Sequence, residues 1–461
     1  MKRRIASLLF SVAMVLGLLC GCDSEGGGES SSGNSSSSPS SSADSVGDVS
    51  TERATLTVYL NTAIGNNAPL VEAYNRNAKD EDRVKIVEFS DDETMAKQIA
   101  TEVLAGKGPD IFLYNSRELP QYLSYAKKGV FTALDPLMEQ NGFSTKDYNE
   151  DALAYGNVEG TQRFFPLGIS LPIVTTLKSV AEKYKLDEIG KKLSYQNYYD
   201  LLEPTGTLGE VYWFDSGVHN LLLPAVPYFI DEEKKESHFD SEEFRKAIQD
   251  YQRVAEAEGG ENGFFSQKKM MSNYTAMTDG LFLLENYYYS DAPGLRLQVE
   301  QAKNRKEIKD GDCVQYYVMH DFGSETEYSA YVQQMVAIND NCKEKEKAWK
   351  FLEFALSVNT QSSMGGSRLI WGNPVNKQAL ESDREIWLQS IGKDRELKKF
   401  IEDYYKALEK ANHYGDYAYN MEYDNEVFKP LLQSYLDGKL TLDQFCRDLD
   451  NKTGIYLKET V

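Results

Sequence analysis

Aromatic side chains gather in three short stretches of the sequence, each of which also contains Asn or Asp. The candidate residues in these stretches are Trp213 in VYWFDSG, Asn286, Tyr287, Tyr288 and Tyr289 in ENYYYSDA, and Tyr417 and Tyr419 in HYGDYAYNM. A sugar ring has an apolar C–H face and a rim of hydroxyl groups, so aromatic rings beside amides and carboxylates suit it. Tyrosine is also common at half-buried positions, so core packing remains an alternative interpretation of each stretch.

A second set of polar residues follows two predicted strands. ATLTVYLN alternates apolar with polar side chains and ends at Asn61, and the apolar run IFLY is followed by Asn115, Ser116 and Arg117. Ligands bind just beyond the carboxyl ends of the strands in open parallel sheets, so we expect these side chains to border one crevice. Asn115 and Ser116 could instead cap the helix that follows them.

The pattern of apolar residues predicts the elements that position these side chains. Apolar residues alternate in 54–61 and 83–90, recur at helical spacing in 68–77 and 92–108, and run without a break in 111–114. The resulting order is strand–helix–strand–helix–strand with short connections. This order is typical of a parallel sheet in an α/β fold.

Residue patterns for catalysis or metal binding are sparse. The four histidines form no H-x-x-x-H or H-E-x-x-H pattern, which argues against a zinc hydrolase. The sequence has no G-x-S-x-G elbow, no G-x-x-x-x-G-K-[ST] phosphate loop and no strict Ca²⁺ loop. We therefore expect no catalytic residue, no cofactor and no metal. With 72 Asp and Glu residues, a glycosidase-like pair of carboxylates stays open as an alternative.

The first 22 residues have the pattern of a signal peptide. A basic start, Lys2–Arg4, precedes the apolar run 5–19, which is shorter than the roughly 20 residues that a membrane span needs. The run ends in Leu-Cys-Gly-Cys, which looks like the bacterial lipobox, with Cys22 as the lipid-modified first residue. An ordinary secretory signal is the alternative. Residues 23–53 are rich in Ser and Gly and predict a disordered tether.

Charge and cysteine content exclude some classes of protein. The chain has 50 basic and 72 acidic residues and a formal charge of −22, which makes nucleic acid an unsuitable partner. Only Cys313, Cys342 and Cys446 follow the lipobox. A bridge between Cys313 and Cys342 is one option, but we expect buried free thiols, because three cysteines make a poor disulfide framework.

Several segments together resemble a known family. LTVYLN, followed by a helix that ends in AGKGPDIFLYNS, is similar to the bacterial extracellular solute-binding proteins that include maltose-binding protein. Four further segments resemble that family in the expected order: 155–187 at a passage between lobes, 346–357 at a Trp-containing helix, 371–380 at the next crossing and 438–459 at the C-terminal helix pair. The resemblance covers nearly the whole chain after the tether.

The resemblance implies a two-lobed α/β fold of the periplasmic-binding-protein type, with a hinge and a cleft between the lobes. The N-terminal lobe would comprise 54–166 and 319–369, the C-terminal lobe 168–315 and 372–461, and the chain would cross near 166–168, 317–322 and 370–373. Gly168 and Gly372 would lie where a hinge must absorb backbone rotation. Ordinary loop glycines are the alternative interpretation of both.

The resemblance also implies positions that face a ligand. Residues 286–289 occupy a ligand-facing loop of the family, and 413–421 lie where the family often has another. Trp371, at the last crossing, is a further ligand-binding candidate. Trp349 is expected in the core, because Leu352 and Leu356 follow it at helical spacing.

The expected function is that of a lipid-anchored, monomeric solute-binding subunit of an ABC importer, on the extracellular face of a Gram-positive cell membrane. It would bind a carbohydrate, in particular an oligosaccharide, by hinge closure and deliver it to the permease subunits. The alternatives are a surface glycoside hydrolase, and a sensor or receptor of the same fold for a solute that is not a sugar.

Overall fold

The computed structural model describes residues 54–63, 67–214, 219–231, 234–259, 273–287, 299–324, 326–362, 369–391, 395–415 and 421–460. The predicted signal peptide and tether, with Cys22, lie outside the described residues, and so do the candidates Tyr288, Tyr289, Tyr417 and Tyr419. For Asn286 and Tyr287 only the backbone is described.

The predicted strand–helix–strand–helix–strand order is confirmed. It consists of β1 (Leu56–Asn61), α1 (Ala68–Asn77), β2 (Val84–Phe89), α2 (Asp92–Leu104) and β3 (Ile111–Tyr114). Strand β1 pairs in parallel with β2 on one side and with β3 on the other. Helix α2 begins where the carboxylate of Asp91 accepts a hydrogen bond from the backbone N–H of Thr94 at 2.7 Å, which satisfies an otherwise unpaired helix donor. The predicted parallel sheet is therefore present.

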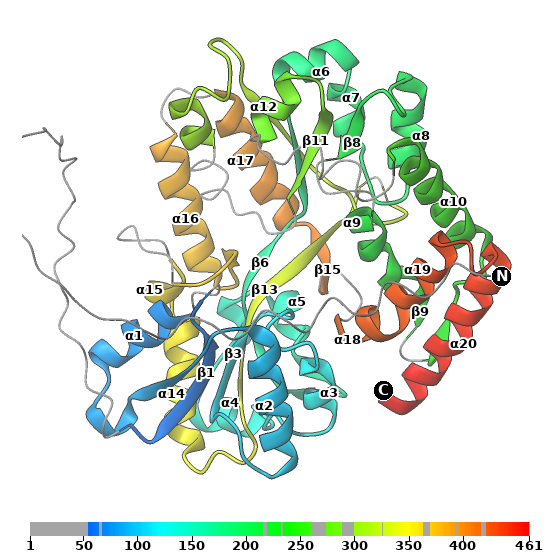
Figure 1. The fold of residues 1–461 in the computed structure, drawn as a ribbon. Helices are drawn as coiled ribbons and strands as arrows, with labels where there is room; N and C mark the ends of the chain where they lie inside the picture. The colour runs from blue at the N-terminus through cyan, green and yellow to red at the C-terminus, as the bar shows by residue number, and fades with distance from the viewer. Residues whose placement is uncertain are drawn as a thin grey trace, which may run out of the picture. The chain divides into compact units, whose positions relative to one another are not determined.

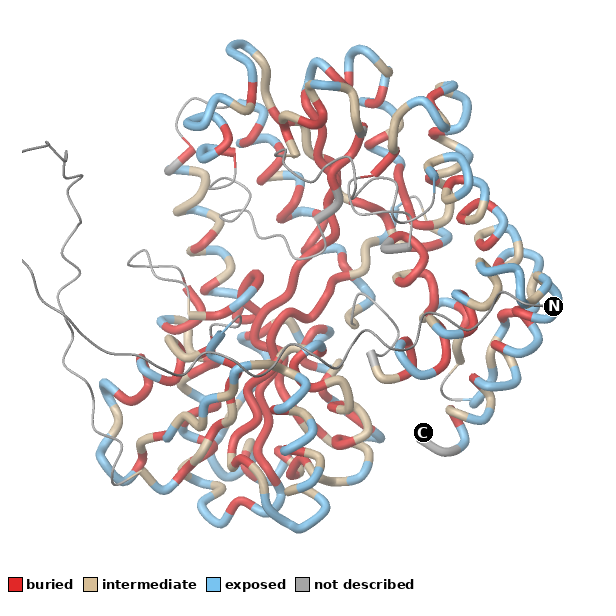
Figure 2. The backbone as a smooth tube through the Cα atoms, in the orientation of Figure 1, coloured by how far each residue is buried: buried red, intermediate tan, exposed pale blue. Residues whose placement is uncertain are grey.

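Later segments extend this first sheet to seven strands. They are β6 (Phe165–Ser170), β13 (Tyr328–Ile338), β14 (Asn373–Pro374) and β15 (Ala411–Gly415). The order is β14-β6-β13-β3-β1-β2, with β15 paired to β13, and β13 runs antiparallel to both β3 and β6. Figure 2 shows β6 and β13 as continuous buried stretches, because both are covered on either face. Their near-continuous apolar sequence reflects this burial.

Helices cover the first sheet and form one hydrophobic core with it. Those after α2 are α3 (Tyr122–Lys127), α4 (Asp135–Asn141), α5 (Glu150–Ala154), α14 (Lys345–Leu356), α15 (Val358–Gln361), α16 (Lys377–Ser390) and α17 (Arg395–Leu408). Helices α1 and α14 lie together (Figure 1), with the ring of Tyr74 edge-on to that of Phe351 at 5.2 Å. The prediction that Trp349 belongs to the core is confirmed, since it is fully buried.

A second sheet of four strands has its own hydrophobic core. Its order is β12 (Val314–Val318), β7 (Ile173–Leu177), β11 (Phe282–Tyr287) and β8 (Tyr212–Phe214). The helices of this part are α6 (Lys178–Tyr184), α7 (Asp187–Gly190), α8 (Tyr198–Leu202), α9 (His219–Leu222), α10 (Glu242–Ala257), α12 (Asn273–Thr278), α18 (Met421–Tyr423), α19 (Lys429–Leu436) and α20 (Leu442–Thr460). The short pairs β4 (Asn157–Val158) with β5 (Thr161–Gln162) and β9 (Ile230–Asp231) with β10 (Glu236–Ser237) are separate two-stranded hairpins.

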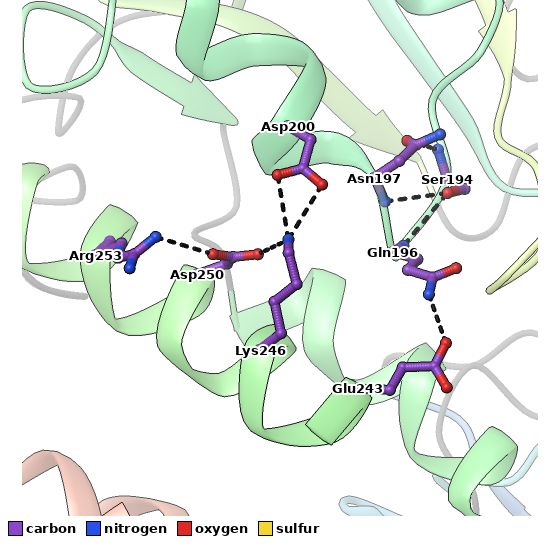
Figure 3. A network of polar contacts seen from close by, with 8 residues as sticks. All are labelled: Ser194, Gln196, Asn197, Asp200, Glu243, Lys246, Asp250 and Arg253. Carbon is purple, nitrogen blue, oxygen red and sulfur yellow. Dashed lines mark hydrogen bonds and ion pairs between the residues drawn. The ribbon is translucent and has the colours of Figure 1, made fainter. Parts of the chain in front are cut away.

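A network of charged residues ties α8 to α10 in the second core (Figure 3). The buried carboxylate of Asp250 accepts a hydrogen bond from Lys246 Nζ at 2.6 Å and lies 3.5 Å from the guanidinium of Arg253. The same Lys246 Nζ lies 3.1 Å from both carboxylate oxygens of Asp200 on α8. A buried carboxylate is tolerated when cations compensate it in this way, so the network has a structural role.

The chain passes from the first core to the second between β6 and β7, which only Leu171 and Pro172 separate. The hydroxyl of Tyr404 on α17 accepts hydrogen bonds from the N–H of Leu171 at 3.1 Å and from the side-chain amide of Asn373 at 2.8 Å. Helix α17 is thus bonded to two of the segments at which the crossings were predicted.

The hydrophobic clusters differ from the predicted division of the chain after residue 372. Apolar residues of α17 such as Phe400 and Ile401 belong to the first cluster, and residues of the second cluster resume at Tyr423. Amphipathic spacing identifies α17 as a helix but does not reveal which core its apolar face covers. The lobe boundaries themselves stay a prediction.

Gly168 and Gly372 both lie in tightly packed backbone where β14 meets β6. A Cβ atom on Gly168 would stand 1.7 Å from the carbonyl oxygen of Trp371, a separation that no side chain permits. Gly372 has a φ of +82°, in the left-handed region that favours glycine. Both glycines are therefore required by close packing and backbone conformation at this crossing.

Two further expectations concern the chain as a whole. Cys313, Cys342 and Cys446 are free thiols, as expected, and the last two are buried. Among the helices within the described residues, none combines the length and the apolar character needed to cross a bilayer.

Candidate ligand-binding site

Polar side chains lie together at the carboxyl edge of the first parallel strands. They come from β1, the starts of α1 and α2, the turn after β3, and β13. Val58 lies opposite Ile111, so β1 and β3 end at the same level, at Asn61 and just before Asn115. Strand β13 brings Gln334 to this level, because its next residue, Met335, pairs with Tyr114, the last residue of β3. The strand register thus places Asn61 and Asn115 at one edge of the sheet, and the prediction that this edge borders a ligand crevice stays a prediction.

Glu118 is the centre of a buried network at this edge. Its Oε2 accepts a hydrogen bond from the backbone N–H of Asn115 at 2.9 Å and from the side-chain amide of Asn67 at 3.2 Å. The Oδ1 of Asn67 in turn accepts from the Nε2 of Gln334 at 2.6 Å. Hydrogen-bonded side chains thus join the turn after β3, the start of α1 and the middle of β13.

Burial raises the pKa of Glu118 to about 7, although the two hydrogen bonds to its oxygen oppose the shift. The side chain is only 5% exposed, and a charged carboxylate loses most of its hydration there. The nearby carboxylate of Asp92 adds a smaller contribution in the same direction. Glu118 therefore changes its charge near neutral pH, within the network that holds the edge together.

Trp371 is an exposed indole on a firmly held backbone. Its side chain is 40% exposed, unlike most large apolar residues of the described chain. The backbone N–H of Trp371 donates to the Oε1 of Gln334 at 3.2 Å, and its backbone carbonyl oxygen packs against Gly168. The chain Glu118–Asn67–Gln334 therefore ends at an aromatic platform. Such a platform loses little conformational entropy when a ligand packs on it.

Gln333 adds a buried amide without a partner. It is 4% exposed, and within the described part of the chain its Nε2 has no hydrogen-bond partner. Its Cγ lies 2.9 Å from where a Cβ of Gly372 would stand, so this side chain packs against Gly372, the residue that follows Trp371. The pairing of β13 with β6 shifts register at Gln333, an irregularity that often redirects side chains near binding sites. A buried donor of this kind is expected to bind water or a ligand.

The remaining predicted residues of the first strands have local roles in this structure. Asn61 is buried, with its amide donating to Asp92 at 2.6 Å and its oxygen accepting from the N–H of Ala63. Asn115 Oδ1 accepts from the N–H groups of Arg117 and Glu118. It therefore caps a turn, and the alternative that it caps the next helix is wrong, because α3 begins only at Tyr122.

Ser116 and Arg117 differ in exposure. Ser116 is buried, whereas Arg117 is exposed. The exposed guanidinium is thus the more accessible of the two for a ligand.

Trp213 is placed differently from the prediction, since it is fully buried in the second core. Its indole N–H donates to the hydroxyl of Thr207 at 2.9 Å, and its backbone N–H donates to Glu258 at 2.7 Å. With its ring covered and its donor satisfied, Trp213 packs as a core residue and offers no face to a ligand.

The prediction missed Asn67, Glu118, Gln333 and Gln334. One signal could have identified the last two, because YVQQMVAI places two adjacent amides inside an otherwise apolar strand. Adjacent residues of a strand point to opposite faces, so at least one amide had to be buried and needed a partner. Asn67 and Glu118 carried no comparable signal, because each stands beside a turn.

The side chains at this edge are amides, the carboxyl groups of Glu118 and Asp92, and one indole. All the hydrogen bonds described above join protein groups to one another. Among the described residues, no group of three or more His, Cys, Asp or Glu side chains could hold a metal ion. The arrangement can recognise hydroxyl groups and the apolar face of a ring.

Three solved structures with the same fold illustrate what the chain is similar to. One is an ABC substrate-binding protein from Listeria monocytogenes in complex with cycloalternan, with 13% identity, a TM-score of 0.59 and coverage of 88% of this chain and 99% of that chain. The cyclic alpha-maltosyl-1,6-maltose binding protein from Arthrobacter globiformis has 14% identity and a TM-score of 0.58, with coverage of 88% of this chain and 99% of that chain. The sugar-binding protein MalE from Xanthomonas citri has 11% identity and a TM-score of 0.60, with coverage of 88% of this chain and 97% of that chain.

Comparison of sequences gives the family. A search among curated proteins finds no match. The family model of the bacterial extracellular solute-binding protein matches residues 70–389, more than two thirds of the chain, and this range includes Glu118, Gln334 and Trp371. The fold is the two-lobed α/β fold of maltose-binding-protein-like receptors. The chain therefore belongs to the bacterial extracellular solute-binding proteins.

Proposed function

We propose that this protein is the carbohydrate receptor of an ABC importer, which binds a neutral oligosaccharide and releases it chemically unchanged. The observation that carries the proposal is the exposed indole of Trp371 on a fixed backbone, beside buried amides at the carboxyl edge of the first sheet. An apolar ring face and a hydroxyl rim match that combination. One solved structure of the same fold is in complex with cycloalternan, and another is that of a cyclic alpha-maltosyl-1,6-maltose binding protein.

Trp371 supplies the platform in this proposal, and Gln333 supplies a donor. A buried amide with no partner gains more from a ligand hydroxyl than a solvated amide does, since it has no water bond to lose. Residues 286–289, 417 and 419 remain proposed ligand contacts. Arg117 is proposed at the edge, where its exposed guanidinium can donate to ligand oxygens.

Hinge closure is the proposed mechanism of capture. A ligand favours the closed state only by the difference between its affinities for the closed and open states. The short Leu171–Pro172 link and the β14 segment beside Gly168 are the proposed hinge elements, with Tyr404 bonded to both. In the closed state both lobes would contact the permease.

The proposed transport role also requires that the receptor be held at the cell membrane. We propose that Cys22 carries the lipid anchor, that residues 23–53 form the tether, and that the monomeric receptor works at the outer face of the membrane with its permease subunits. The extracellular family to which the chain belongs supports this placement. Metabolic labelling with a fatty acid, lost in Cys22→Ser, would test the anchor.

Calorimetric titration with a panel of neutral oligosaccharides tests the binding proposal. A sugar that binds should lose at least about tenfold in affinity in Trp371→Ala, the effect of losing a central aromatic contact, and less in Trp371→Phe. Leu104→Ala is the matched control, because Leu104 is also an exposed apolar residue, 91% exposed at the end of α2. Equal losses in Trp371→Ala and Leu104→Ala would contradict the proposed site.

A thermal-shift screen tests the ligand class independently of any residue. A ligand at about 100 times its Kd should stabilise the protein by about 2.7 kcal/mol. If amino compounds shift the transition and no carbohydrate does, the ligand class is wrong. If oligosaccharides are cleaved, and the cleavage is lost on changing one Asp or Glu, the protein is a hydrolase instead.

A further inference from the structure

A chain of hydrogen bonds connects the backbone of Trp371 to the carboxyl group of Glu118. The backbone N–H of Trp371 donates to Oε1 of Gln334 at 3.2 Å, and Nε2 of Gln334 donates to Oδ1 of Asn67 at 2.6 Å. The amide of Asn67 then donates to Oε2 of Glu118 at 3.2 Å. Two side-chain amides thus link the carboxyl group to the aromatic platform. We name these four residues the relay.

Every hydrogen bond of the relay points in the same direction. A backbone N–H can only donate, so that of Trp371 requires the oxygen of Gln334 to face it. The nitrogen of Gln334 therefore points toward Asn67, and the nitrogen of Asn67 points toward Glu118. Each amide has the positive end of its dipole on the side of Glu118. A negative charge on this carboxyl group therefore favours the observed arrangement of both amides.

Burial lets a charge on Glu118 act along the relay. Glu118, Asn67 and Gln334 are all buried, and Gln334 is only 1% exposed. The field of a charge is screened less in such surroundings than in water. A hydrogen bond to an ionised acceptor is stronger than one to a neutral acceptor, and bonds in a chain polarise one another. Ionisation of Glu118 should therefore strengthen all three bonds of the relay.

Glu118 exists in both charge states near neutral pH. Burial raises its pKa to about 7, and the carboxylate of Asp92, at the start of α2, acts in the same direction. From β1, the amide of Asn61 donates to Asp92 at 2.6 Å. Helix α1 and strand β13 contribute the two amides of the relay, and Arg117, beside Glu118 in the turn, is exposed. The charge of the relay thus changes within a range of pH that is easily studied.

Protonation removes the charge of Glu118 without changing the hydrogen-bond pattern. Its Oε2 already accepts from the backbone N–H of Asn115 and from the amide of Asn67, so in the neutral form the proton is carried by Oε1. Oε2 remains an acceptor in both forms. The relay therefore becomes stronger or weaker with pH, but its connections stay the same.

We propose that Glu118 senses pH for the site around Trp371, because its ionised carboxylate makes the relay hold the backbone of Trp371 more firmly. The charge still lowers the stability of the whole protein, since the effect of burial on the pKa outweighs that of the hydrogen bonds. The consequence for binding rests on the function proposed above. A ligand that packs on the indole should bind about two- to fivefold more tightly at pH 8 than at pH 6, at the weak end of couplings between sites.

The backbone amide of Trp371 reports on the relay without any ligand. We would label tryptophan with ¹⁵N, which gives one backbone amide signal for each of the four tryptophans, and assign Trp371 from the signal lost in Trp371→Phe. The amide proton of Trp371 should move downfield as the pH rises, with a midpoint at about 7, because its hydrogen bond becomes stronger. Glu118→Gln removes the charge and Asn67→Leu interrupts the relay, so each should abolish this shift. Asn67 makes no side-chain cap bond to α1, so Asn67→Leu leaves the helix without a lost cap.

Trp213 provides a matched reference in the same spectrum. Its backbone N–H donates directly to Glu258 at 2.7 Å, and burial raises the pKa of Glu258 to about 7 as well. The Trp213 amide should therefore shift near pH 7 in wild type, Glu118→Gln and Asn67→Leu, which also shows that the variants are folded, and should lose the shift in Glu258→Gln. A Trp371 signal without a step near pH 7 would overturn the proposal, and so would a step that persists in Glu118→Gln or Asn67→Leu.

Calorimetric titration with cycloalternan and with maltotriose, at pH 6 and pH 8, tests the consequence for binding. The affinity of a sugar that binds should be higher at pH 8 in wild type and independent of pH in Glu118→Gln. Equal affinities at the two pH values in wild type would overturn the link between the relay and binding. If neither sugar binds at either pH, the result counts against the proposed function, whereas the amide signals still decide the relay.

Discussion

Replacement of Glu118 by Gln tests the energetics of the buried edge. Both hydrogen bonds to this carboxyl group end on the same oxygen, Oε2, so the amide oxygen of a Gln side chain can accept them from Asn115 and Asn67. What changes is the charge, because Gln remains neutral at every pH. Glu118→Gln therefore isolates the cost of holding a carboxylate at this place.

The sign of the effect follows from the direction of the pKa shift. The pKa of Glu118 is raised from an ordinary 4.5 to about 7, so between these values the folded protein binds a proton that the unfolded chain has lost. Stability then falls as the pH rises from about 4.5 through about 7. Each unit of difference between the pKa of the folded and the unfolded protein is worth about 1.4 kcal/mol. The ionised carboxylate therefore destabilises the folded protein by about 3 kcal/mol at pH 8.

Denaturant unfolding of wild type and Glu118→Gln at pH 4.5 and pH 8 measures this cost. The two proteins should be equally stable at pH 4.5, whereas Glu118→Gln should be more stable by up to about 3 kcal/mol at pH 8. Glu72→Gln, an exposed carboxyl group on α1, should change little at either pH. A Glu118→Gln protein that is no more stable than wild type at pH 8 would refute the argument that burial dominates.

Two further predictions concern packing and the charged network. Gly168→Ala should lower the free energy of unfolding by about 1–3 kcal/mol or more, because its Cβ would collide with the carbonyl oxygen of Trp371; an unchanged midpoint in denaturant would contradict this close approach. Asp250→Ala should lower the free energy of unfolding by about 1–3 kcal/mol, because it removes the buried carboxylate with which Lys246 pairs on α10. Carbohydrate affinity should stay unchanged in calorimetry. A loss of affinity would show that the network also serves the site.

The first three strands of the first sheet, and the helices between them, could be predicted from the sequence. Helix 68–77 and strand 111–114 have the predicted bounds, because apolar periodicity there is strong and Pro69 and the glycines of GKGPD delimit the elements. The placement of α17 could not be predicted, since its apolar stripe fits either core. That choice depends on contacts distant in sequence, such as the hydrogen bonds that the hydroxyl of Tyr404 accepts from Leu171 and Asn373.

The candidate site was predicted only in part. The edge position of Asn61 and Asn115 followed from the rule for parallel strands, and Trp371 from the resemblance to the family. Trp213 was misplaced because its neighbours look like a loop, and no local pattern shows that Thr207 satisfies its indole N–H. Glu118 was missed because its raised pKa results from burial, and burial depends on contacts distant in sequence.

The central claim is that the protein binds an oligosaccharide and does no chemistry on it. Native mass spectrometry of the chain after the tether, mixed with a defined set of neutral oligosaccharides, tests this most directly. The account predicts a complex with one intact oligosaccharide, released unchanged on heating, and a weaker complex in Trp371→Ala. Shortened saccharides in the mixture, or no complex with any member of the set, would contradict it.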